Sequence, residues 1–389
     1  MSAIDDKYVA LGGAGGFLGA AETPEQACPD GVGRFRHYKG GSIYWHPLTG
    51  ASEVHGLIRS KWAMLGWEKS ALGYPKTDER SSAGGPKGRY NLFQGGAILW
   101  KEGAAEAFEM HGAIRSKFGE QGYESGILGF PTTDETPTPD GVGRFNHCEH
   151  GSIYWKPSIS AHEVHGLIRA YWAANGWERN QALGYPISDE LPTYPGSASR
   201  FNDFENGVVY WHAGSSHATA LSRFVIGNAS KTVDEVMAAI NAVLVAKLKS
   251  NSRVYITGGP SFSGVTDYSF NGSQVIDRKY LVHVDLGIDI SGVPDPTTNI
   301  DFTFSVGFDR TAGKVWVALD HAQVHTHVPF PTSLGLSAKE VNDQLLAVIN
   351  PVVGVRQNEV TLPSGMHLLS VKVMPNGDLN VYVQPLFES

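Results

Sequence analysis

The sequence predicts two domains: an N-terminal array of four repeated units, mainly of β-structure with short helices, and a C-terminal α+β domain with a curved antiparallel sheet and two helices. Three observations support this. A nine-residue stretch recurs at a nearly fixed period, an aromatic hairpin pattern recurs with it, and both patterns stop after Trp211. We therefore expect repeats over residues 1–216 and a second domain over residues 217–389.

The nine-residue stretch contains a Leu-Gly pair, an aromatic residue and Pro, and it ends in Asp-Glu. It reads ALGYPKTDE at 71–79, ILGFPTTDE at 127–135 and ALGYPISDE at 182–190, with a divergent copy, FLGAAETPE, at 17–25. The successive Leu-Gly pairs are 54, 56 and 55 residues apart. A period of this length indicates one structural unit used repeatedly. The Gly permits a turn with unusual dihedral angles, and the Pro fixes the direction in which the chain leaves it.

Each copy is followed by an aromatic pattern that predicts two short strands around a Gly-containing turn. The second strands end at Trp45, Trp100, Trp155 and Trp211. A His-Gly pair then opens a segment in which Ile58, Trp62 and Leu65 have helical spacing, and Gly66 is placed as a helix C-terminal cap. Each unit is thus predicted to contain a short helix, the Leu-Gly turn and a hairpin.

Four whole units run from about Ile4 to Trp211 with no half-unit left over. This favours a closed ring or a propeller-like arrangement. An open solenoid is the alternative, with the divergent first copy as its cap.

The motif Leu-Gly-aromatic-Pro, followed by Thr or Ser and then Asp-Glu at a spacing near 55 residues, resembles the LGFP repeat family. Only Ala20-Ala21, in the first copy, departs from the aromatic-Pro pair. The family's repeats occur in actinobacterial envelope proteins, often beside an esterase or amidase domain. The resemblance implies attachment to cell-wall polysaccharide and an extracellular or cell-surface location, although the N-terminus does not read as a secretory signal. We expect no enzyme, because the sequence contains no Gly-x-Ser-x-Gly, P-loop or His-Glu-x-x-His motif.

Sugar recognition requires an aromatic face for the apolar side of the ring and polar groups for its hydroxyls, and the repeats supply both several times. The residues expected to bind carbohydrate are Trp45, Trp100, Trp155, Trp211, Tyr44, Tyr154, Tyr210, Asp78, Glu79, Asp134, Glu135, Asp189, Glu190, Arg89 and Arg144. Adjacent strand residues face opposite sides, so one member of each Tyr-Trp pair is expected in the core. Alternatively, the acidic pairs cap backbone amides or pair with the hairpin arginines.

Composition excludes several other functions. The net charge of −8 argues against nucleic-acid binding, and no apolar run approaches the roughly 18 residues of a membrane helix. No cofactor or metal is expected. One His per repeat, at His55, His111 and His165, does not form a ligand cluster. In the strand pattern that includes His321, His325 and His327, the first two lie roughly 13 Å apart, too far for one ion.

The C-terminal part predicts a helix over 231–250, long alternating strands between 282 and 319, a second helix over 337–353 and a closing Asn-Gly hairpin. We read the Gly-Ser stretch at 258–264 as a loop. The order of elements resembles tubular lipid-binding domains. The alternatives are a packing or oligomerisation domain and a pore-forming domain, the last disfavoured by strands that look short and poor in Ser and Thr.

These patterns predict a non-enzymatic, lectin-like or wall-attaching protein whose repeats bind a polysaccharide or glycoconjugate multivalently. Residues 217–389 are expected to form a homo-oligomer or to bind a second ligand such as lipid. The rival prediction is a lipid- or membrane-interacting protein whose repeats target it to a surface.

Overall fold

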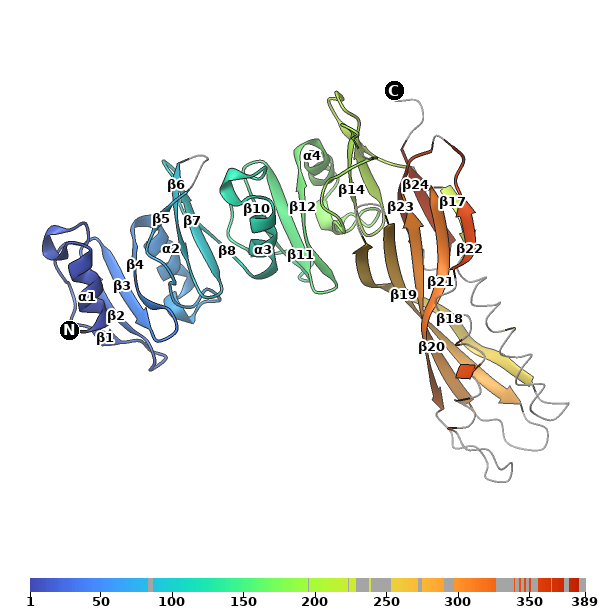
Figure 1. Cartoon of the computed structure of the whole chain (residues 1–389), viewed down its shortest axis with the longest axis horizontal. Helices are drawn as coiled ribbons and strands as arrows, with labels where there is room; N and C mark the ends of the chain where they lie inside the picture. The colour runs from blue at the N-terminus through green and yellow to red at the C-terminus, as the bar shows by residue number, and fades with distance from the viewer. Residues whose placement is uncertain are drawn as a thin grey trace. The chain divides into compact units, whose positions relative to one another are not determined.

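The computed structural model describes residues 1–82, 87–194, 196–222, 224–228, 253–271, 275–289, 297–326, 356–364, 366–373 and 378–384, and single residues 238, 339, 343, 346, 347 and 350 (Figure 1). Contacts between Cα atoms divide the chain into two compact units. The first contains Met1–Glu190, Asn202–Gly207 and Ser216–Ala218, and the second contains Leu191–Phe201, Val208–Ser215 and Thr219–Ser389. The domain boundary expected at residue 216 stays a prediction.

The four predicted repeats are confirmed as units of one short helix and a four-stranded antiparallel sheet whose strands follow sequence order. The first has α1 (Ala3–Ala10), β1 (Gln26–Ala27), β2 (Arg34–Tyr38), β3 (Gly41–His46) and β4 (Gly50–His55). The second has α2 (Gly56–Leu65), β5 (Arg80–Ser81), β6 (Gly88–Leu92), β7 (Gly96–Lys101) and β8 (Phe108–His111).

The third and fourth repeats have the same element order. The third has α3 (Gly112–Glu120), β9 (Thr136–Pro137), β10 (Arg144–His147), β11 (Gly151–Lys156) and β12 (Ile159–His165). The fourth has α4 (Gly166–Ala174), β13 (Leu191–Pro192), β14 (Arg200–Asp203), β15 (Val208–Trp211) and β16 (Ala218–Ala220). A single 3₁₀ turn follows each helix: η1 (Gly13–Gly15), η2 (Trp67–Lys69), η3 (Tyr123–Ser125) and η4 (Trp177–Arg179).

The motif residues have the structural roles that their chemistry predicts. The Leu side chains are at most 2% exposed, and they anchor the turn in the core. The Gly that follows has a positive φ in all four copies, for example 66° at Gly73, which a residue with a Cβ adopts at a cost. The helix α2 ends at Gly66, whose φ of 98° is that of a left-handed cap.

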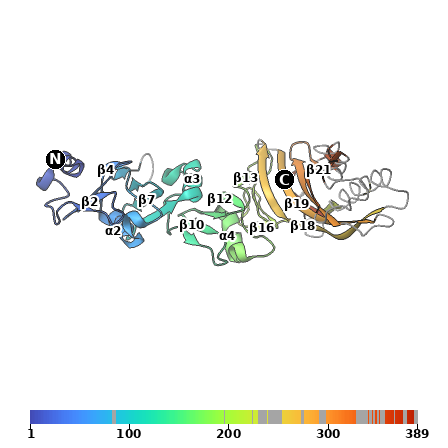
Figure 2. The same ribbon diagram turned by 90° about the horizontal axis from the view of Figure 1, so that it is seen from below.

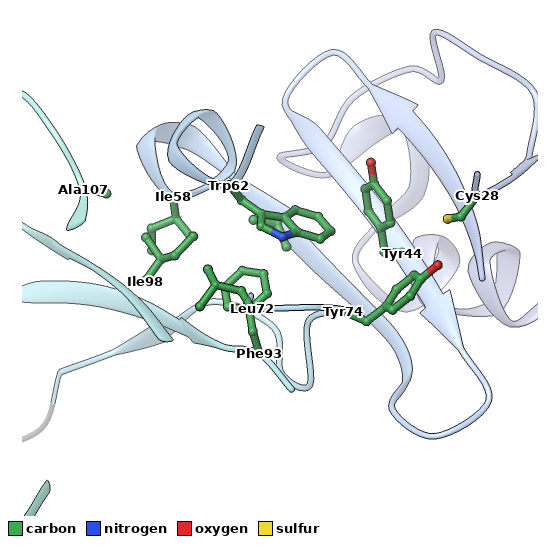
Figure 3. Close-up of a cluster of buried hydrophobic side chains, with 10 residues drawn as sticks. Cys28, Tyr44, Ile58, Trp62, Leu72, Tyr74, Phe93, Ile98 and Ala107 are labelled. Atoms are coloured by element: carbon green, nitrogen blue, oxygen red, sulfur yellow. The ribbon is translucent and has the colours of Figure 1, made fainter. Parts of the chain in front are cut away.

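The hydrophobic core is shared between successive repeats. One cluster joins Cys28 and Tyr44 of the first repeat to Trp62, Leu72 and Phe93 of the second. Figure 3 shows Trp62 in the middle of this cluster, with Tyr44 on one side and Ile58 and Ile98 on the other. Because side chains of two repeats share this cluster, each of these repeats stabilises its neighbour. The contacts described below join successive repeats, and closure of a ring stays a prediction.

The second unit contains two further antiparallel sheets. One has the order β17 (Phe224–Asn228), β24 (Asp378–Val383), β23 (Leu368–Val373). The other has five sequential strands, which lie side by side in both views (Figure 1 and Figure 2): β18 (Arg253–Asn271), β19 (Val275–Asp289), β20 (Thr297–Asp309), β21 (Lys314–Thr326) and β22 (Arg356–Thr361).

Two expectations about this unit are wrong. The stretch at 258–264 is part of the strand β18. The pairing of β18 with β19 has register shifts at Gly258 and Ser261, and these irregularities accommodate the Gly, Pro and Ser residues. The strands β18–β21 are 13 to 19 residues long, so the argument from short strands does not hold. The alternation predicted along β20 is seen from Ile300 to Phe304, where Ile300, Phe302 and Phe304 are buried and Asp301 and Thr303 are only half-buried.

The helices predicted over 231–250 and 337–353, and the Asn-Gly turn, lie outside the described residues except for single positions. His327 is also outside them, whereas His321 and His325 lie in β21, opposite Thr303 and Asn299. Within the described part of the chain, no helix combines the length and apolar character needed to span a membrane.

Candidate functional site

Three hairpin tryptophans lie across an antiparallel strand pair from an arginine. The register places Arg34 opposite Trp45, Arg89 opposite Trp100, and Arg144 opposite Trp155. Opposed residues project from the same face of a sheet, so the Trp and Arg side chains of each pair leave that face from adjacent positions. We refer to these three as the Trp–Arg pairs. Arg34 was not among the residues predicted to bind carbohydrate, although it occupies the same hairpin position as Arg89 and Arg144.

Exposure separates the Tyr-Trp pairs as alternation predicts. Tyr44 and Tyr154 are 3% exposed and Tyr210 is 1% exposed, so their rings belong to the cores and have little surface to offer a ligand. The four tryptophans are half-buried. The indole N–H of Trp100 donates to the carbonyl of Ala104 at 2.9 Å, and that of Trp211 donates to the carbonyl of Ser215 at 2.9 Å. These two indoles are therefore held at one edge.

Each arginine of the Trp–Arg pairs lies beside a glutamate, and Arg89 donates its hydrogen bond to Ser81 Oγ at 2.7 Å. Arg144 Nε lies 2.5 Å from Glu135 Oε1 and Arg89 Nε lies 3.8 Å from Glu79 Oε1, while Arg34 pairs with Glu25. The Glu79 and Glu135 side chains are only 9% and 5% exposed, whereas Arg89 and Arg144 are 49% and 36% exposed. The arginine therefore faces solvent and the glutamate orients it.

A histidine lies between that glutamate and a second, buried one. His111 Nε2 is 3.2 Å from Glu135 Oε1, and its Nδ1 is 2.9 Å from Glu109 Oε2. The same arrangement recurs with His55 between Glu53 and Glu79, and with His165 between Glu163 and Glu190. An imidazolium that donates from both nitrogens satisfies both carboxylates at once.

In this cluster the pKa values of His55, His111, Glu79 and Glu135 are all raised. The hydrogen bond to Glu109 raises the pKa of His111, although burial opposes it, and Glu53 does the same for His55. Burial raises the pKa of Glu135 and of Glu79, although the neighbouring His and Arg oppose it. Among the described residues, no group of three or more His, Cys, Asp or Glu side chains is arranged to hold a metal ion.

The buried glutamates Glu53, Glu109 and Glu163 were not predicted. Each also accepts a hydrogen bond from the backbone N–H of the motif glutamate in the next repeat, at 2.8 Å for Glu79, 3.0 Å for Glu135 and 2.9 Å for Glu190. The recurrence of Glu-x-His before the helix, at 53–55, 109–111 and 163–165, is the sequence signal that identifies them.

The motif aspartates have structural partners for both carboxylate oxygens, including backbone amides of the kind that the alternative interpretation gave them. Asp134 Oδ1 accepts from the backbone N–H of Glu109 at 3.0 Å, and its Oδ2 accepts from Lys61 Nζ at 2.8 Å. Asp78 is bound in this way by Glu53 and Lys7, and Asp189 by Glu163 and Lys117. Burial alone raises the pKa of Asp189, but hydrogen bonds from His162 and Lys117 outweigh it and lower that pKa to about 2.

The geometry therefore brings together three of the predicted residue types in each of the first three repeats, Trp, Arg and Glu, and assigns Asp to the joint between repeats. Charged donors beside a half-buried indole suit a ligand with both C–H and hydroxyl surfaces.

Comparison with known proteins identifies the repeats. The profile of the LGFP repeat family matches residues 18–70, 72–126, 128–180 and 183–227, which together make up more than half of the chain. Among solved structures, a crystal structure of lipopolysaccharide binding protein is 9% identical, over 98% of this chain and 95% of that chain, with a TM-score of 0.18. That score is too low to indicate a shared fold. No curated protein sequence matches the chain at a significant level.

Proposed function

Because this chain belongs to the LGFP repeat family, we propose that its repeats bind a cell-wall polysaccharide or another extended glycoconjugate multivalently and without catalysis. The observation that supports this most strongly is the recurrence of the Trp–Arg pair on the hairpins of the first three repeats.

Each pair offers the two surfaces that a sugar residue presents. The indole face packs against the apolar C–H side of the ring, and the guanidinium donates hydrogen bonds to hydroxyl oxygens. The carboxylates of Glu79 and Glu135 already have Arg and His partners. We therefore give them the role of positioning the arginine. In this proposal Trp and Arg contact the glycan, and Glu positions the Arg.

Repetition compensates for the weakness of one small contact. Binding at one repeat raises the effective concentration of the polymer at the next, and the resulting avidity exceeds a single-site affinity by roughly 10² or more. The proposal therefore predicts strong retention on a polymer and weak binding of its isolated fragments.

The roles expected for residues 217–389, self-assembly or lipid binding, remain proposals, as does the rival function of a lipid- or membrane-interacting protein. One experiment separates the two functions: co-sedimentation of the full chain with purified insoluble cell-wall polysaccharide and, in parallel, with sugar-free phospholipid vesicles. Retention on the polysaccharide that soluble glycan reverses supports the proposed function. Retention on the vesicles alone supports the rival.

A further inference from the structure

The middle joint differs from the other two in a cluster where an arginine of the helix meets the preceding hairpin. At the first joint, Arg59 Nε donates to Ser42 Oγ at 2.6 Å, and His37 Nδ1 lies 2.7 Å from the same oxygen. The guanidinium lies over the ring of Trp67, 5.4 Å from its centroid. The rings of Tyr44 and Trp67 stack at 5.9 Å. The polar groups of this cluster therefore hydrogen-bond to one another, and its aromatic rings pack against one another and against the guanidinium.

The third joint repeats this arrangement almost without change. Arg169 Nε donates to Ser152 Oγ at 2.6 Å, and His147 Nδ1 lies 2.7 Å from that oxygen. The guanidinium lies 5.3 Å from the ring centroid of Trp177, and Tyr154 stacks on this Trp at 6.0 Å.

At the middle joint, the residues that fill the cluster are replaced by smaller or apolar ones. Ala97 stands at the position of Ser42 and Leu92 at that of His37. Leu99, Phe118 and Tyr123 stand where the first joint has Tyr, Trp and Trp. As a result, Arg115 Nε is buried and has no hydrogen-bond partner, whereas its counterparts Arg59 and Arg169 have theirs.

The smaller side chains leave a cavity of about 290 Å³, lined by Arg115 and Glu124 and by the rings of Tyr90, Phe118 and Tyr123. Tyr123 has a φ of 56°, a left-handed conformation that it shares with Trp67 and Trp177 at the other joints, and it is 47% exposed. The Arg115 guanidinium lies 5.8 Å from its ring centroid. An exposed aromatic ring, an unsatisfied buried donor and a carboxylate thus meet around one space.

We propose that this cavity binds one neutral sugar residue of the glycan, making the middle joint the position at which the array selects its ligand. A ring hydroxyl accepts from the Arg115 guanidinium, another hydroxyl donates to Glu124, and the C–H face packs on the Tyr123 ring. The volume is at the lower end for ligand sites, which suits a single monosaccharide. Glu124 disfavours an acidic sugar by charge repulsion. The inference rests on the proposed function and adds the class of ligand and the residues that recognise it.

The other joints supply the matched variant. Leu92→His combined with Ala97→Ser installs the side chains that satisfy the arginine elsewhere in the chain, and Ala97→Ser alone supplies only the hydroxyl. We would measure saturation-transfer NMR of the full-length protein and both variants with glucose, galactose, mannose and arabinose, and with glucuronic acid as the acidic probe. Thermal unfolding of each variant checks that the repeats fold.

The wild type is expected to bind at least one neutral sugar. The double variant should bind it at least tenfold more weakly, and the single variant should lie between them. Absence of neutral-sugar binding, a preference for glucuronic acid, or undiminished binding by a folded double variant would each overturn the inference. If polysaccharide retention persists in any of these cases, the proposed function survives and only the middle cavity is misassigned. Loss of polysaccharide retention in the wild type contradicts the proposed function itself.

Discussion

Lys61 Nζ lies 2.8 Å from Asp134 Oδ2, which joins the helix of the second repeat to the motif of the third across 73 residues of sequence. The same contact is formed by Lys7 with Asp78 and by Lys117 with Asp189. These ion pairs, with the backbone amides that bind the other carboxylate oxygen, connect each repeat to the next.

The contact of Lys61 is expected to stabilise the array more than that of Lys7. The Lys61 side chain is 7% exposed and Lys7 is 26% exposed, so removal of Lys61 leaves a less solvated gap beside Asp134. We predict that Lys61→Ala lowers the free energy of unfolding by about 1–3 kcal/mol, and Lys7→Ala by less than about 1 kcal/mol. Urea denaturation of the two variants measures the difference, and equal losses would refute this ranking.

The contribution of His111 to stability should fall as the pH rises through neutrality. The folded state raises the pKa of His111 above its ordinary value near 6.5, so its contribution is fully present below that value and is lost as the pH rises through the higher folded pKa. The raised pKa of Glu135 acts with the same sign at lower pH. Chemical denaturation from pH 5.5 to 8.5 should show that the stability lost in His111→Gln is largest at pH 5.5 and decreases as the pH rises. A loss that is constant or increases over this interval would contradict the account.

A buried asparagine is expected to be necessary at each joint. Asn146 Nδ2 donates to the carbonyls of Glu109 and Thr133, at 3.0 and 2.9 Å, and the residue is 0% exposed. Asn146→Ala leaves both carbonyls without this donor and should cost about 2–4 kcal/mol of unfolding free energy. The matched control is Asn175→Ala, where the side chain is exposed and bonds only to its own helix. If both substitutions have the same small effect in thermal unfolding, the asparagine does not have this role.

Much of the repeat fold could be predicted because its signals are local. The Leu-Gly pairs, the Gly caps and the alternation in the hairpins are properties of a few neighbouring residues. Alternation also predicted that one residue of each Tyr-Trp pair is buried. Tyr44 is the buried one because Trp62, in the helix that follows the hairpin, packs edge to face against it. Their ring centroids are 4.5 Å apart.

The remainder depends on contacts that are distant in sequence. The sequence indicates that Asp78 could bind a sugar, but in the structure Lys7, 71 residues earlier, donates a hydrogen bond to it. Glu53 and Asn91 are polar residues in strands, and only the fold shows that they meet at a joint. Likewise, Gly258 and Ser261 indicate a loop locally, but pairing with β19 over a long strand outweighs that preference.

The most direct test of the account concerns the Trp–Arg pairs. We would compare the retention of four proteins on purified insoluble cell-wall polysaccharide: the wild type, two triple variants and a control. One triple variant combines Trp45→Ala, Trp100→Ala and Trp155→Ala, and the other combines Arg34→Gln, Arg89→Gln and Arg144→Gln. The control combines Leu48→Ala and Met64→Ala, at two exposed positions. The account predicts that both triple variants lose at least tenfold in apparent affinity while they keep cooperative thermal unfolding, and that the control binds as the wild type does. Wild-type retention by folded triple variants would contradict it.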